Sequence, residues 1–414
     1  MKWYIYILLT ACLMLSSCYH DEIEYVDFYS LPTLGKTFVP TSEREYAFSL
    51  SDSIPSARHI PRKASSIDGV GLVRGLSETL TTNQIHQVSG TYLSDDGRGN
   101  EIRLSGAVYL PKGNIIKGVI VSCHYTVCAD YEVPSQTCMM DAWWATKGYA
   151  VVMPDYMGYG ASREHIHPYM QGELTAKHVI DMILAVRSFL ASRKIQTLSS
   201  DILLTGYSQG AHAALHTLRM IENTDLYPEY ADARITIRKC IAGDGLYNLS
   251  EYFLKSATNN YIAIPCAVPM LVLGMNVGRR NPFDYEYFFS ERTLTNYEEW
   301  IVSKRYTLDQ LSEIIGTASL NRILSKAACD LQNPASMKFY KELQKHNIPL
   351  DYVPRTPVVL FHSKNDGVID IYQTEHLLWQ FEAGGAAVTS DFGTYGVHGM
   401  AYLRFLYKVY TEEL

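Results

Sequence analysis

The fold is indicated first by the stretch Asp201-Ile-Leu-Leu-Thr-Gly206-Tyr-Ser208-Gln-Gly210. Residues 201–205 predict a short buried strand, and residues 208–222 have the pattern of a helix. The Gly-x-Ser-x-Gly motif therefore lies at a strand-to-helix junction, where a sharp turn strains the serine backbone and needs glycines beside it. The motif predicts that Ser208 is a nucleophile held over the end of a sheet, with the positive end of a helix behind it.

Other apolar runs predict strands that flank this one. They cover residues 118–123, 149–153, 235–242, 357–361 and 386–392. Residues 88–110 predict a β-hairpin, and helices are expected over 135–147, 172–194 and 370–383. Buried strands that alternate with helices are typical of a parallel sheet covered on both faces. The predicted fold class is therefore α/β, with a mostly parallel central sheet and helices on both faces.

The pattern changes in residues 250–347, which are helical and rich in aromatic side chains. We interpret this segment as a helical cap inserted between a first core part, residues 45–249, and a second, residues 348–414. Within it, residues 261–277 are apolar, but Pro265 and Pro269 interrupt them, and 17 residues is a marginal length for a bilayer span. A buried or lid helix is expected there.

A serine nucleophile needs a base, and the base needs an orienting acid. In a fold with this motif both partners follow the serine in the chain, the acid first. Asp366 comes just after the strand at 357–361, where the acid belongs, and Asp370 is the alternative.

The base is predicted to be His398, which lies in Gly396-Val-His-Gly399 after the last predicted strand. His362 and His376 are the downstream alternatives. His362 falls in or at the end of a strand and His376 falls within a helix, so both are expected to be packing residues.

Acyl transfer also requires hydrogen-bond donors for the developing oxyanion. The backbone N–H of Gln209, directly after the nucleophile, is one expected donor. The loop after the strand at 118–123 should supply the other. Thr126 is the first choice there and Tyr125 the second.

The sequence resembles the secretory lipase family of α/β-hydrolases over roughly residues 84–412. The motifs that carry the resemblance are Val88-Ser-Gly, Gly106-Ala-Val-Tyr-Leu-Pro111, His124-Tyr-Thr126, Gly148-Tyr-Ala-Val-Val-Met-Pro-Asp-Tyr-Met-Gly-Tyr-Gly160, His167-Pro-Tyr169 and Gly206-Tyr-Ser-Gln-Gly210. The resemblance implies hydrolysis of carboxylic esters, often lipid esters, with Ser208, Asp366 and His398 as the triad. It also implies a cap between the sixth and seventh strands of the family's sheet and no metal or organic cofactor. Tyr125 departs from the family, which usually has glycine there, and is expected to narrow the pocket.

The first residues resemble a bacterial lipoprotein signal. A lysine and an apolar stretch precede Leu15-Ser-Ser-Cys18, which is similar to a lipobox. We expect residues 1–17 to be a signal peptide and Cys18 to carry the lipid, with residues 18–44 as a tether. The expected location is the cell envelope, as an outer-membrane lipoprotein that could be exposed at the surface.

The charge composition limits the kinds of binding partner that we expect. The chain has 414 residues, 36 basic and 43 acidic, with a formal net charge of −7 and no basic block, which argues against nucleic acid. The expected partners are a small-molecule or lipid ester and the membrane, while the oligomeric state stays open. A peptidase on the same fold and a non-catalytic lipid- or sugar-binding lipoprotein are the alternative functions.

Tyrosine occurs 31 times against 13 phenylalanines, and part of this excess falls in the cap and in the loops at Tyr125, Tyr156, Tyr159 and Tyr207. A few of these tyrosines are expected to contact substrate. Six cysteines remain after Cys12 and Cys18, and their spacing argues against a metal site. Their disulfide pairing stays open: Cys123, Cys128, Cys138, Cys240, Cys266 and Cys329.

Overall fold

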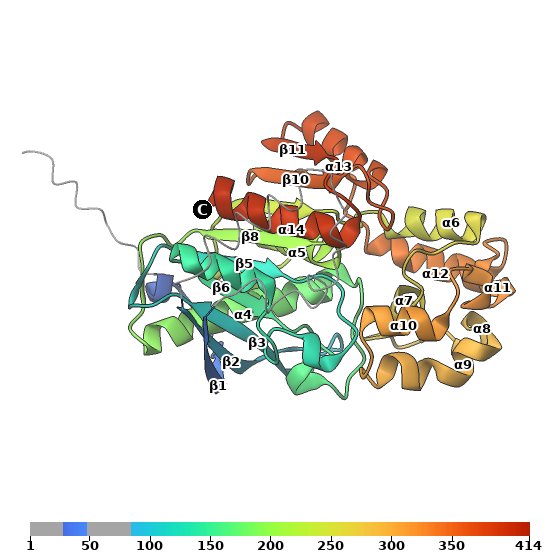
Figure 1. The fold of residues 1–414 in the computed structure, drawn as a ribbon, viewed down its shortest axis with the longest axis horizontal. Helices are drawn as coiled ribbons and strands as arrows, with labels where there is room; N and C mark the ends of the chain where they lie inside the picture. Colours follow the sequence, from blue (N-terminus) through green and yellow to red (C-terminus); the bar gives the residue numbers. More distant parts are fainter. Residues whose placement is uncertain (1–27, 48–83) are drawn as a thin grey trace, which may run out of the picture.

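A computed structural model describes residues 28–47 and 84–414 (Figure 1). The predicted signal peptide, residues 1–17, and the predicted lipidation site, Cys18, lie outside the described residues. Within the described part of the chain, no helix has the length and apolar character needed to cross a membrane.

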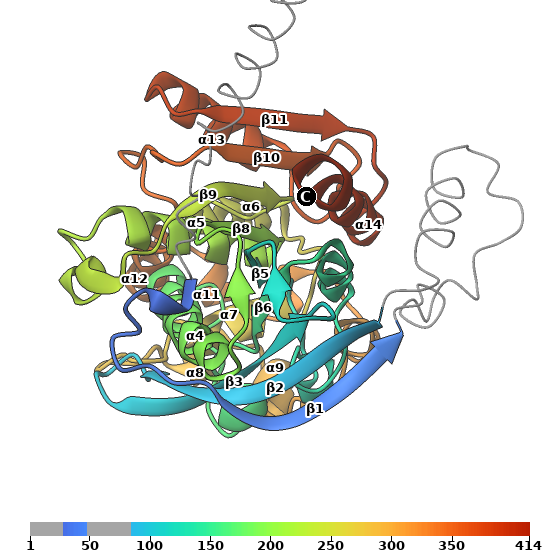
Figure 2. The same ribbon diagram turned by 90° about the vertical axis from the view of Figure 1, so that its left-hand side faces the viewer.

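The described residues form a nine-stranded sheet with the order β1-β2-β3-β6-β5-β8-β9-β10-β11. The strands are β1 Val39–Ala47, β2 Gln84–Asp95, β3 Glu101–Leu110, β5 Val119–Cys123, β6 Ala150–Pro154, β8 Ile202–Tyr207, β9 Ile237–Gly243, β10 Val358–Ser363 and β11 Val388–Gly393. Six neighbouring strands are parallel to one another: β6, β5, β8, β9, β10 and β11. The remaining pairs, β1 with β2, β2 with β3 and β3 with β6, are antiparallel. Figure 2 shows the sheet extending from β1 at one edge to β11 at the other. A short second sheet pairs β4 Ile115–Ile116 with β7 Gln196–Thr197.

Alternate residues of the central strands enter two different hydrophobic clusters, one on each face of the sheet. On β8, Leu204 belongs to the cluster that contains α4 and α5, and Leu203 belongs to the cluster that contains α14. The helices outside the cap are α4 Gly172–Ser192, α5 Gln209–Glu222, α13 Tyr372–Ala383 and α14 His398–Lys408. Short 3-10 or π helices are η1 Phe28–Ser30, η3 Asp130–Glu132, η4 Met140–Lys147, η5 Gly160–Ser162, η6 Pro228–Ala233 and η9 Val409–Glu413. The mostly parallel α/β sheet with helices on both faces is confirmed.

Two local expectations differ from the structure. The helix expected over 135–147 is a 3-10 helix limited to Met140–Lys147, which buries Trp143 and Trp144 under the sheet. The expected tether, residues 18–44, extends too far, because residues from Val39 on form β1 and pair with β2. Phe28, within the same segment, is also fully buried in the core.

The segment between β9 and β10 forms a separate group of helices at one end of the sheet (Figure 1). These helices are α6 Leu249–Asn259, α7 Ala267–Gly274, α8 Tyr285–Phe288, α9 Glu291–Tyr297, α10 Leu308–Ile315, α11 Lys326–Cys329 and α12 Pro334–Lys345, with η7 Glu298–Val302 and η8 Leu320–Arg322. They have a hydrophobic cluster of their own, which includes Phe253, Phe288 and Phe339. Within the apolar stretch 261–277 the structure forms one short helix, α7, and Ile262, Cys266 and Met275 outside this helix are buried in the same cluster.

Candidate active site

The turn after β8 holds Ser208 in a strained backbone conformation. Ser208 has φ 56° and ψ −119°, a region that residues with side chains rarely adopt, and its N–H donates to Gly243 O at 2.9 Å. A Cβ atom on Gly206 would lie 2.0 Å from Gly210 O, and one on Gly210 would lie 1.8 Å from Cys123 O. Both motif glycines are therefore required by close packing, as the sequence predicts.

The structure brings Ser208, His398 and Asp366 into one hydrogen-bonded chain. Ser208 Oγ lies 2.9 Å from His398 Nε2, and His398 Nδ1 lies 2.6 Å from Asp366 Oδ2. The other carboxylate oxygen of Asp366 accepts the N–H groups of Val368 at 2.7 Å and Ile369 at 3.1 Å. Because both oxygens of Asp366 have partners, the carboxylate is fixed and can hold the imidazole in one orientation.

The alternatives to these residues are not part of this hydrogen-bonded chain. Asp370 forms an ion pair with Lys255 on the surface, and the ring of His376 packs against Tyr372. His362 is fully buried, and its nitrogens lie 2.6 Å from Thr374 Oγ1 and 3.1 Å from Ile369 O.

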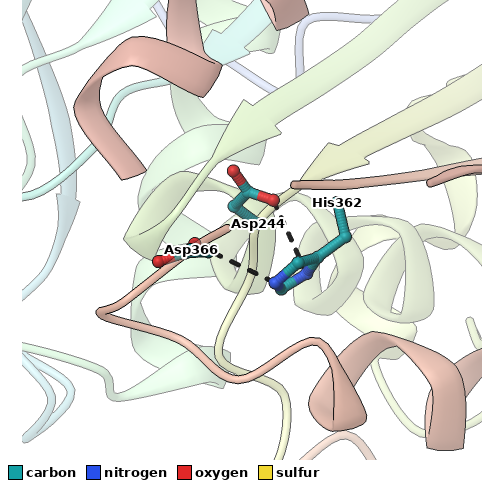
Figure 3. Close-up of side chains that lie close together, drawn as sticks. All are labelled: Asp244, His362 and Asp366. Carbon is teal, nitrogen blue, oxygen red and sulfur yellow. Dashed lines mark ion pairs between the residues drawn. The ribbon is translucent and has the colours of Figure 1, made fainter. Parts of the chain in front are cut away.

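A second carboxyl group, Asp244, lies close to the triad acid. The ring of His362 faces both carboxyl groups (Figure 3). Its Nδ1 lies 3.5 Å from Asp244 Oδ1 and its Nε2 lies 3.9 Å from Asp366 Oδ2. The three side chains form the group within the described residues whose ligand atoms are close enough for a metal ion. However, Asp366 already binds His398, and both nitrogens of His362 have protein partners, so the group does not provide a vacant set of ligands.

The predicted oxyanion donors lie beside the nucleophile. Thr126, Ser208 and Gln209 line the same pocket, and within the described residues the amides of Gln209 and Thr126 donate no hydrogen bond to another group. Tyr125 does not line this pocket, because its ring packs edge-on against Tyr402, with centroids 5.0 Å apart. The expectation that Tyr125 narrows the pocket is therefore wrong, since its side chain points into the core.

The side chain of Gln209 has a buried partner that sequence reasoning did not identify. Its Nε2 donates to His167 Nε2 at 2.8 Å, and His167 Nδ1 donates to Met157 O at 2.8 Å. Burial lowers the pKa of His167 to about 3, so this imidazole is neutral. The motif His167-Pro-Tyr169 was the available signal in the sequence.

An apolar pocket extends from Ser208 under the cap. Helices α6 and α7 form much of its wall through Leu249, Tyr252, Phe253, Ala267, Val268 and Leu271. Among the tyrosines, Tyr169 and Tyr252 reach this pocket, whereas the loop tyrosines expected to contact substrate do not line it: Tyr125, Tyr156, Tyr159 and Tyr207. Tyr156, Tyr159 and Tyr207 are buried instead.

The six cysteines of the described residues are free thiols. Cys128, in the loop after β5, and Cys266, before α7, have their sulfur atoms 3.8 Å apart. Burial raises the pKa of the Cys123 thiol to about 12, so this group is protonated and unreactive.

The sheet order, the strained serine between β8 and α5, and the helical insertion after β9 define an α/β-hydrolase fold. The family model described as Secretory lipase matches residues 133–233, a segment that contains Ser208. No curated protein sequence matches this chain significantly.

Solved structures extend the similarity to nearly the whole chain. A putative hydrolase from Legionella pneumophila is 17% identical, with a TM-score of 0.71, over 91% of this chain and 99% of that one. A ligand-bound form of the rice cell wall degrading esterase LipA from Xanthomonas oryzae is 20% identical, with a TM-score of 0.70, over 90% and 97%. Candida antarctica lipase A in its closed state is 15% identical, with a TM-score of 0.57, over 90% and 82%. These structures show the fold, and together with the family match they support a hydrolase of the lipase or esterase class.

Proposed function

We propose that this chain is a serine hydrolase that cleaves carboxylic esters through an acyl-enzyme. The observation that carries the proposal is the hydrogen-bonded chain from Ser208 through His398 to Asp366, at distances of 2.9 Å and 2.6 Å. These distances match those of a nucleophile, a general base and an orienting acid.

The proposed reaction follows from the positions of these groups. His398 Nε2 takes the proton of Ser208 Oγ as this oxygen attacks the ester carbonyl, and Asp366 stabilises the imidazolium that forms. The N–H groups of Gln209 and Thr126 donate to the oxyanion, with Tyr125 as the alternative second donor. His398 then gives its proton to the leaving alcohol. In the second half of the reaction His398 takes a proton from water as the water oxygen attacks the acyl carbonyl, and it returns this proton to Ser208 Oγ as the carboxylic acid leaves.

The pocket supports an apolar acyl group as the part of the substrate beside Ser208. Its wall between α6 and α7 is made mostly of aliphatic and aromatic side chains, which favour hydrocarbon over charged groups. A lipid anchor at Cys18, in the outer membrane of the cell envelope, completes the proposal and rests on the lipobox-like sequence.

Hydrolysis assays on purified protein test this function. Nitrophenyl esters of increasing chain length are compared with aminoacyl-naphthylamides for the wild type and for Ser208→Ala, with His376→Gln as a matched control on the surface. We expect the wild type and the control to hydrolyse esters, and Ser208→Ala to lose at least about 10⁴-fold in kcat. Turnover of the amides alone would identify a peptidase, and a folded wild type without turnover would favour a binding protein.

A further inference from the structure

Tyr207, the last residue of β8, has two oxygen neighbours at its hydroxyl group. Its Oη forms a short hydrogen bond with Asp244 Oδ2 and lies 2.6 Å from the backbone oxygen of His398. Asp244 follows β9 directly, and His398 is the first residue of α14. The phenol therefore joins the ends of three elements beside the nucleophile.

The single proton of the Tyr207 hydroxyl group cannot be shared with both of these oxygen neighbours. A phenol carries one proton, and a backbone carbonyl can only accept. If the Tyr207 proton were donated to an ionised Asp244, the phenol and carbonyl oxygens would face each other at 2.6 Å without a proton between them. Two hydrogen bonds exist at Tyr207 only if Asp244 supplies the second proton.

We propose that Asp244 is a neutral carboxylic acid that donates to Tyr207 Oη, while Tyr207 donates to the carbonyl oxygen of His398. Tyr207 and Asp244 are then positioning residues that hold the backbone of His398. This positioning role rests on the proposed role of His398 as the base. Because Tyr207 directly precedes Ser208, the same strand end fixes the nucleophile and the base.

The surroundings of Asp244 fit a neutral acid. The residue is fully buried, and its Oδ1 accepts the N–H of Ser363 at 2.8 Å, which leaves Oδ2 to carry the proton. Burial raises the pKa of Asp244 and outweighs the opposing effects of His362, of Tyr207 and of the Ser363 amide, while the neighbouring Asp366 acts in the same direction as burial.

The ionisable groups facing Asp244 are Tyr207 on β8, His362 on β10, Asp366 after β10, and Tyr247. His362 needs no positive charge, since it can donate from Nε2 to Ile369 O and accept from Thr374 at Nδ1. A neutral Asp244 leaves Asp366 as the one carboxylate among these groups.

Substitutions at Asp244 distinguish the two protonation states. In Asp244→Asn the amide oxygen can still accept from Ser363 and the amide NH₂ can donate to Tyr207, as the neutral acid does. We expect Asp244→Asn to keep kcat within about threefold of wild type, and Asp244→Ala and Tyr207→Phe to lose about tenfold or more in kcat with a nearly unchanged KM. Tyr352→Phe, which removes another buried phenol–carboxylate bond of 2.8 Å, is the control and should leave kcat unchanged.

Infrared difference spectra of wild type minus Asp244→Asn at pH 7 give a readout that does not depend on activity. We expect a carboxylic-acid C=O band from Asp244 in the wild type. A carboxylate band in its place, or an Asp244→Asn variant as slow as Asp244→Ala, would overturn the proposal. If the acid band is present but the wild type hydrolyses no ester, the protonation state stands and the proposed function fails.

Discussion

At the residue scale, the turn that carries Ser208 depends on two positions without side chains. The carbonyl of Cys123 approaches Gly210 so closely that a Cβ there would lie 1.8 Å from it. Neither the carbonyl, fixed in β5, nor α5 can move without disturbing the sheet. The glycine is therefore needed for stability as well as for the position of the nucleophile.

Gly210→Ala is expected to reduce the free energy of unfolding by about 2 kcal/mol or more, because the new methyl group overlaps backbone atoms. Gly118→Ala is the matched control, since the nearest atom to its Cβ would be 3.6 Å away, an ordinary contact. We expect the control to change stability by less than about 1 kcal/mol. Urea titrations of both variants measure this, and equal losses would contradict the packing argument.

Asp155, directly after β6, links stability to pH. Its carboxyl group accepts hydrogen bonds from Ser105 and Ser135, and burial raises its pKa to about 6. The folded protein therefore holds this proton more tightly than the unfolded chain does. The contribution to stability is complete below about pH 4 and is lost as the pH rises through about 6.

We expect the unfolding free energy of wild type, relative to Asp155→Asn, to fall by roughly 2–3 kcal/mol between pH 4 and pH 7. Urea unfolding of both proteins across this range measures the difference. A relative stability that stays constant would mean that folding leaves the pKa of Asp155 unchanged, and one that rises with pH would mean that folding lowers it; either result would contradict the prediction.

At the element scale, the strands and helices that carry the triad could be predicted because their apolar runs are unambiguous. Residues 118–123 and 201–205 were predicted as strands, and the structure has β5 and β8 there. β1 could not be predicted, since its residues Ser42, Glu43 and Arg44 lie on an exposed edge strand and lack an apolar pattern. Pairing with β2, and not local propensity, forms this strand.

Helix α7 offers a prediction about substrate size. Leu271 lines the apolar pocket beside Ser208, so Leu271→Trp should fill part of the space for an acyl chain. We expect kcat/KM for a nitrophenyl octanoate to fall about tenfold or more, and for the acetate by less than about threefold. Leu254→Trp on α6, where the leucine is 40% exposed and outside the pocket, is the control. Equal losses of kcat/KM for both esters would show that this pocket does not hold the acyl chain.

At the scale of the whole molecule, the hydrolase core and the cap have separate hydrophobic clusters, and the cap lies at one end of the sheet (Figure 1). Residues of both parts line the pocket beside Ser208. Chain order restricts the acid and the base to residues after Ser208, and the positions of Asp366 and His398 directly after predicted strands select them from the alternatives. The proposed role of Asp244 could not be predicted from the sequence, because its contact with Ser363 joins residues 119 positions apart that belong to no motif. Contacts of this kind follow from strand order, which periodicity does not encode.

The proposed anchor concerns the whole chain as well. Cys18→Ser is expected to abolish incorporation of labelled fatty acid and to move the protein from the membrane to the aqueous phase in detergent partitioning. Cys12→Ser, within the apolar stretch of the predicted signal peptide, should keep both the label and the membrane fraction. Labelled protein in the Cys18→Ser variant would rule out this cysteine as the acylated residue.

The proposed function depends on Ser208 being an activated nucleophile. The most direct measurement is mass spectrometry of the protein after treatment with a fluorophosphonate, which reacts with serines activated by a general base. We expect one adduct on Ser208 in the wild type, none in folded Ser208→Ala, and slow labelling in His398→Gln. A folded, mature wild type that remains unlabelled, or an adduct on another serine, would show that Ser208 is not the activated nucleophile.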